Sequence, residues 1–116
     1  MSLQTRLLCA YDAGRLAALA IVRAAGYRPH GSERHHHVTF DVARSLAGTR
    51  ELADALFEMN ALRSLRHALE YEAYKGADAE AVASAISAAT RVINLGAKYL
   101  RAERVNLGKR IHMVKP

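Results

Sequence analysis

Cysteine, proline and tryptophan are scarce in this sequence, and their scarcity excludes several classes of protein. The 116 residues include one cysteine, two prolines and no tryptophan. A single cysteine, Cys9, excludes a disulfide framework and a cysteine-based zinc site, and we expect it to be a small buried apolar residue. No apolar run reaches the roughly 20 residues of a membrane span, and residues 1–8 lack the pattern of a secretion signal. The sequence therefore predicts a cytoplasmic protein without membrane association.

The composition is that of one folded domain with an excess of positive charge. Apolar residues make up 51% of the chain and charged residues 24%, which excludes intrinsic disorder. Lys and Arg number 17 against 11 Asp and Glu, a formal charge of +6. This balance favours an anionic partner such as RNA, DNA, a nucleotide or an acidic protein.

Abundant alanine and the absence of β-branched clusters indicate an all-helical chain. Apolar residues recur at helical spacing in four stretches. The predicted helices are Ser2–Ala25, His36–Ala47, Arg50–Tyr74 and a fourth that starts after Asp78 and keeps its repeat to Leu100.

Local signals mark the ends of these helices. Gly26 fits a left-handed cap, and Pro29 then disfavours further helix. Thr49 and Asp78 are residue types that cap helix N-termini, and Gly76 closes the third helix.

Three long helices and one short one, joined by tight connections, predict an antiparallel four-helix bundle. We assign residues 1–104 to this single domain. Residues 105–116 show little periodicity and are predicted to be a basic tail with a frayed end. Because a chain of this size buries only a modest core, we expect a homodimer.

The third helix changes character along its length. Leu52, Leu56 and Met59 fall along one side of it. At about 100° per residue, the same side continues into polar residues within an arc of roughly 140°, while a leucine stripe stays apolar for the core. The polar residues are Arg63, Arg66, His67, Glu70, Tyr71 and Tyr74, and the leucines are Leu62, Leu65 and Leu69. Since guanidinium and imidazole groups beside a core must be paired or solvated, this break in the pattern indicates function.

The segment Arg66-His67-x-x-x-Tyr71 resembles the signature of the HEPN superfamily, an arginine followed by a polar residue, three variable residues and a histidine. Three further stretches resemble a bacterial subgroup of HEPN-like proteins. They are Ala10-Tyr11-Asp12-Ala13, Ala24-Ala25-Gly26-Tyr27-Arg28 and His35-His36-His37-Val38-Thr39-Phe40. The similarity covers roughly residues 8–100 and implies the helical HEPN fold.

The resemblance also implies an activity, because active HEPN domains are metal-independent endoribonucleases that are commonly dimers. No cofactor is expected. Arg66 would bind the scissile phosphate with help from Arg63, since a guanidinium donates in a planar fork and stays charged. The phosphate-binding set also includes Glu70 and Tyr74, and the catalytic set is Arg66, His67 and Tyr71.

Tyrosine stands at position 71, where the superfamily usually has histidine. Histidine titrates near neutral pH, whereas tyrosine titrates near 10 and serves better as a hydrogen-bond donor than as a base. His67 lies about one turn away and is the candidate to take over the acid–base role.

Two functions therefore stay open. The first is a toxin-type ribonuclease, which by analogy with the family would be neutralised by a nucleotidyltransferase-type antitoxin. The second is a non-catalytic, dimeric module for protein interaction or nucleotide binding. In that module Arg66 would pair with Glu70 or with an acidic group across the dimer.

The triple histidine is a weaker candidate site. Adjacent histidines in a loop seldom point at one ion, and the chain has no HExxH pattern, so we assign no metal site. We expect one of His35–His37 to pack at the start of the second helix. Lining a cleft for an anion, near Arg28 and Arg34, is the alternative.

Overall fold

The computed structural model describes residues 2–27, 34–66 and 78–114, with the backbone alone for 34–37 and 107–114. These residues form helices and no strand, which confirms the all-α class. The helices are α1 (Leu3–Ala24), α2 (Arg34–Leu46), α3 (Arg50–Ala61) and α5 (Ala79–Val114).

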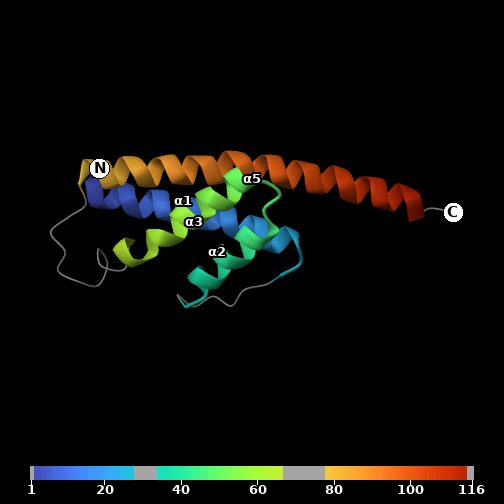
Figure 1. The fold of residues 1–116 in the computed structure, drawn as a ribbon, viewed down its shortest axis with the longest axis horizontal. Coiled ribbons are helices and arrows are strands. Elements are labelled where there is room, and N and C mark those ends of the chain that lie inside the picture. Colours follow the sequence, from blue (N-terminus) through green and yellow to red (C-terminus); the bar gives the residue numbers. More distant parts are fainter. Residues whose placement is uncertain (1, 28–33, 67–77, 115–116) are drawn as a thin grey trace.

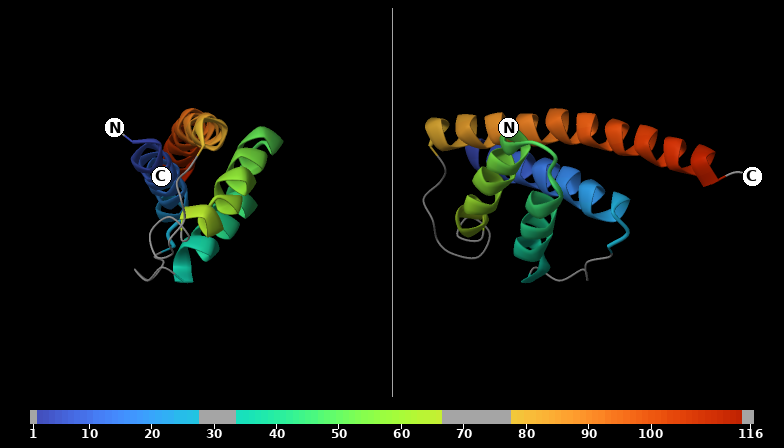
Figure 2. Two further views of the ribbon diagram at one scale, coloured as in Figure 1. Left: turned by 90° about the vertical axis from the view of Figure 1, so that its left-hand side faces the viewer. Right: turned by 45° about the vertical axis from the view of Figure 1, so that its right-hand side comes forward.

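Helix α1 is central and lies against α5, α2 and α3 (Figure 1). The end-on view in Figure 2 shows α1 and α5 side by side, with α2 and α3 on the other side of the molecule. Helices α1 and α5 run in the same direction, so the expectation of an antiparallel bundle is wrong for this pair (Figure 1). The reason is topological, because α3 leads back towards the start of α1 and α5 begins beside it.

Short-range hydrogen bonds confirm the predicted caps. Gly26 has φ of 92°, and the N–H of Tyr27 donates to the carbonyl of Val22 at 3.2 Å, which completes a Schellman-type end of α1. The Thr49 hydroxyl accepts from the N–H of Leu52 at 3.2 Å. The Asp78 carboxylate accepts from the N–H of Ala81 at 2.7 Å. Each of these signals acts within one helical turn, so it could be identified without knowing the tertiary structure.

The predicted helix Arg50–Tyr74 is not continuous. Helix α3 ends at Ala61, where the N–H of Leu62 donates to the carbonyl of Met59 at 3.1 Å, a bond three residues back. Such a bond is a tightened last turn. Residues 63–66 are helical again after this interruption.

The C-terminal segment is also different from the prediction. Helix α5 has 36 residues and reaches Val114, so residues 105–114 are helical rather than frayed. A helix of that length is about 54 Å long, and its end extends past the other helices (Figure 1). The segment contains no proline, and Leu107, Lys109, Arg110 and Met113 have high helix propensity even without an amphipathic pattern.

The core lies where the helices meet α1. Leu52, Leu56 and Met59 are at most 1% exposed, which confirms them as the core side of α3. Leu62 and Leu65 are partly buried and pack against the same core, as the leucine stripe predicted. Cys9 is exposed, so the expectation that it is buried is wrong. It lies at the surface between α1 and α5, in a groove that Arg6, Ile86 and Ile93 also line.

Among the described residues, no helix is long and apolar enough to cross a membrane.

Candidate anion-binding site

Arg66 lies against α1 rather than in open solvent. Its guanidinium carbon is 5.3 Å from the centre of the Tyr11 ring, within the distance of a cation–π interaction. Its Nε is 3.8 Å from Oδ1 of Asp12, and the side chain is only 14% exposed. The guanidinium group is therefore held between an aromatic face and a carboxylate.

Asp12 brings a second arginine to the same point. Nε of Arg15 lies 3.9 Å from Oδ1 of Asp12, the atom that also faces Arg66. The Asp12 side chain is 48% exposed and that of Arg15 25%. Both distances are longer than a hydrogen bond, so the attraction is coulombic and partly screened by solvent.

Tyr11 is the buried aromatic residue over whose ring Arg66 lies. Its side chain is fully buried, and its ring packs edge-on against Phe40 of α2, with 5.9 Å between ring centres and 66° between planes. Burial raises the pKa of Tyr11, while the positive charges of Arg66, Arg63 and Arg15 lower it in part. Three arginines thus act on one phenol.

A close contact between α1 and α3 sets the position of the cluster. A Cβ on Gly14 would lie 2.5 Å from Cε and 2.9 Å from Sδ of Met59. The absence of a side chain at residue 14 therefore lets Met59 pack directly against the α1 backbone. Helix α3 crosses α1 obliquely and runs in the opposite general direction (Figure 1), and Arg66, which follows Met59, contacts Tyr11 and Asp12, which precede Gly14. This geometry places Arg66 next to Tyr11 and Asp12.

The charges of the cluster do not cancel within the described part of the chain. Among the described residues it holds three guanidinium groups, from Arg15, Arg63 and Arg66, and one carboxylate, from Asp12, so 3 − 1 leaves two positive charges. Arg63 is exposed. Fixed guanidinium groups with an exposed edge are suited to bind phosphate or carboxylate oxygens.

The structure joins only part of the predicted site. Arg66 lies in the cluster, and the positive charge of the exposed Arg63 acts on the same phenol. His67, Glu70, Tyr71 and Tyr74 lie outside the described residues, as do Arg28 and the predicted helix end at Gly76. His35–His37 fall in the first turn of α2, where the backbone alone is described.

Sequence reasoning missed the contribution of α1. Tyr11, Asp12 and Arg15 had no assigned role, and the contact between Arg66 and Asp12 of the same chain was not among the pairs predicted for Arg66. The signal was present, because Asp12 and Arg15 are charged residues one turn apart in a helix that is otherwise mainly apolar. Nothing local in the sequence, however, indicates that Arg66 lies opposite Asp12 and Arg15.

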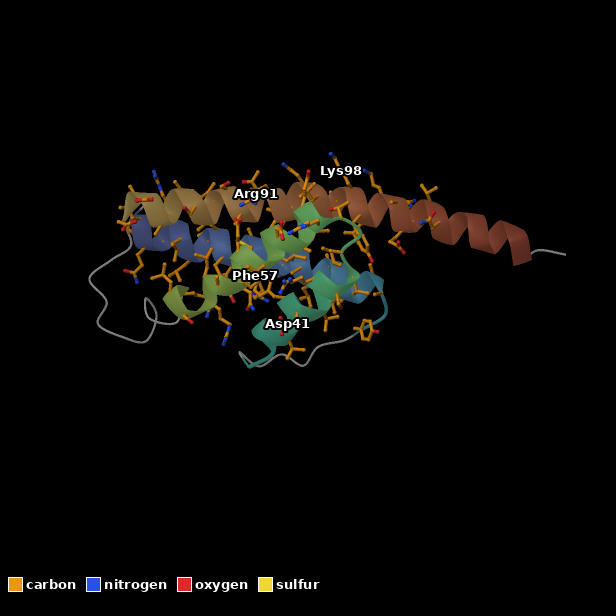
Figure 3. All side chains as sticks on the ribbon, viewed as in Figure 1. Asp41, Phe57, Arg91 and Lys98 are labelled. Carbon is orange, nitrogen blue, oxygen red and sulfur yellow. The ribbon has the colours of Figure 1, made fainter. Side chains whose placement is uncertain are left out.

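Other charged contacts lie on different surfaces. Arg91 of α5 pairs with Glu58 of α3, and Arg44 lies over the ring of Phe57, 4.8 Å from its centre. Figure 3 shows Phe57 and Arg91 on these helices, with Lys98 pointing away from the rest of the molecule. These contacts join helices and surround no common anion site. Within the part of the chain that is described, no three His, Cys, Asp or Glu side chains gather around a point suitable for a metal ion.

Comparison with known proteins identified no similar protein. No family model matches the chain, and neither the curated proteins nor the solved structures searched include a match.

The pKa of Tyr11 predicts a pH dependence of stability. A pKa raised above the ordinary value of about 10 means that the folded state favours the protonated phenol. This contribution is fully present below about pH 10 and is lost as the pH rises through the folded-state value. We expect Tyr11→Phe to lose less unfolding free energy than the wild type between about pH 9 and about pH 11. Urea unfolding at each pH measures the difference.

Tyr99→Phe is the control for that experiment. Burial also raises the pKa of Tyr99, with a further contribution from Glu103, but this side chain is less buried than Tyr11. Tyr99→Phe should therefore reduce the loss of unfolding free energy at alkaline pH less than Tyr11→Phe does. Equal slopes for wild type and Tyr11→Phe would contradict the assignment.

Proposed function

We propose that this chain is a HEPN-like protein that binds RNA through its arginine cluster and cleaves it without a metal ion. The observation that carries the proposal is the placement of Arg66, mostly buried against Tyr11 and beside Asp12, with Arg15 and Arg63 acting on the same phenol. A surface arginine with a merely solubilising role needs no such support.

The chemistry of cleavage suits this cluster. The RNA 2′-hydroxyl loses its proton and attacks the adjacent phosphorus, and the 5′-oxygen leaves with a proton. Negative charge grows on the non-bridging oxygens, which guanidinium groups stabilise by charge-assisted hydrogen bonds. Arg66 and Arg63 are the candidates for this role. His67 and Tyr71 are the candidates for proton transfer.

The second candidate function is a non-catalytic interaction module. The pair between Arg66 and Asp12 favours it, because this contact lies within one chain and contributes to the packing of residues 63–66 against α1. In this case Arg66 is a structural residue, and its loss would reduce stability more than it reduces RNA binding. A homodimer is expected for either function, whereas an antitoxin-type partner belongs to the first function alone.

The test is an assay with fluorescent single-stranded RNA in the presence of EDTA. We expect binding that weakens steeply as salt increases, since phosphate contacts release counterions, together with cleavage of the RNA. Arg66→Ala should abolish cleavage and weaken binding by at least about tenfold while the protein stays folded.

Arg50→Ala is the matched control, because it removes the same charge from a side chain that is 94% exposed and pairs with Asp54. It should leave cleavage unchanged. RNA binding without cleavage would favour the interaction module. Equal effects of Arg66→Ala and Arg50→Ala would contradict a phosphate site at Arg66.

A further inference from the structure

Asp12 occupies the position that a bridging anion would take. Its Oδ1 atom lies 3.8 Å from Nε of Arg66 and 3.9 Å from Nε of Arg15. A ligand oxygen that contacts both Nε atoms must therefore displace this carboxylate oxygen. A phosphate can do so, because it carries several acceptor oxygens and can approach each donor to hydrogen-bond distance.

The carboxylate is placed so that it can leave. Asp12 is 48% exposed, and both of its contacts are longer than hydrogen bonds. Because the carboxylate is about half exposed, solvent screens both contacts, and water readily solvates the released carboxylate. The α1 backbone need not move, since rotation of one short side chain is enough to vacate the position.

Arg15 gives independent support. Its Nε is buried and makes no hydrogen bond with any described residue. A buried donor without an acceptor is unfavourable, and Oδ1 of Asp12 at 3.9 Å is too far to be that acceptor. An anion seated between the two arginines would supply it.

We infer that Asp12 is an internal counter-anion that competes with the phosphate ligand of this site and so lowers its affinity. This inference rests on the proposed function, because it concerns regulation of the same arginine cluster. Without ligand, Asp12 reduces the repulsion between Arg15 and Arg66. With ligand, the phosphate takes over this role and the carboxylate turns to solvent.

Asp12→Asn tests the inference, because asparagine keeps the shape and removes the charge. We expect the variant to bind fluorescent single-stranded RNA roughly fivefold more tightly than the wild type, a change of the size expected for one partly exposed pair. Asp54→Asn is the matched control. It also removes one negative charge, but from a side chain that is 63% exposed and pairs with Arg50 on α3. Its affinity should change less than about twofold.

Inorganic phosphate provides a second measurement that does not depend on RNA. A ligand that binds the folded state raises the melting temperature, so added phosphate should raise that of Asp12→Asn more than that of the wild type or Asp54→Asn.

The outcomes separate the inference from the proposed function. If the wild type binds RNA and Asp12→Asn binds equally or more weakly, Asp12 does not compete and the inference is overturned, while the proposed function stands. If neither protein binds RNA or responds to phosphate, both are overturned. Tighter RNA binding by Asp12→Asn, matched by Asp54→Asn, shows only a general charge effect and also overturns the inference.

Discussion

Replacing Phe40 with alanine is expected to lower the free energy of unfolding by about 3–5 kcal/mol. The side chain is 1% exposed and its ring packs edge-on against Tyr11. Removing the ring loses buried apolar area and leaves a cavity that the surrounding helices fill only in part. Urea unfolding followed by far-ultraviolet circular dichroism measures the loss.

Phe57→Ala is the matched control, because it makes the same change at a side chain that is 55% exposed. Its main described contact is the stacking of Arg44, so we expect a loss of no more than about 1 kcal/mol. Equal losses for the two variants would show that Phe40 is not a core residue.

The Phe40 substitution also has a functional consequence. Phe40 supports the ring on which Arg66 lies. In the folded fraction of Phe40→Ala, we therefore expect weaker RNA binding than in Phe57→Ala. Folding and binding are separated by measuring affinity well below the melting temperature.

Gly14→Val is expected to destabilise the protein by roughly 1–3 kcal/mol, the usual cost of overpacking a core. A Cβ at this position would come within 2.5 Å of Cε of Met59, which is itself fully buried. Gly96 differs, because its added Cβ would lie 3.4 Å from Cδ1 of Ile21. Gly96→Ala should therefore be neutral or stabilising by up to about 1 kcal/mol, since alanine is the better helix former.

A double-mutant cycle tests the cause of the Gly14 effect. Met59→Ala removes the atoms that a Cβ at residue 14 would meet, and alone it should cost about 2–5 kcal/mol. Valine at 14 adds as many heavy atoms as alanine at 59 removes. The double variant should therefore be more stable than the sum of the two single losses predicts. Strict additivity would place the strain of Gly14→Val elsewhere.

Local features of the fold could be predicted because they act over a few residues. The caps at Thr49, Asp78 and Gly26 involve partners within five positions. The core side of α3 follows from the repeat of Leu52, Leu56 and Met59. The end of α3 at Ala61 could not be found in this way, because Leu62 is a good helix former and no glycine or proline marks the break.

The candidate site could likewise be predicted only where it depends on local sequence pattern. Periodicity was enough to single out Arg63 and Arg66, since a charged residue on an apolar side of a helix is visible in the sequence itself. The sequence by itself thus determined the helical class, the caps at Gly26, Thr49 and Asp78, and which arginines interrupt the core pattern. Only the tertiary structure decided that α5 runs parallel to α1 and that Asp12 and Tyr11 meet Arg66. These residues are distant along the chain, and their contact depends on how closely two helices pack at Gly14, which no local propensity encodes.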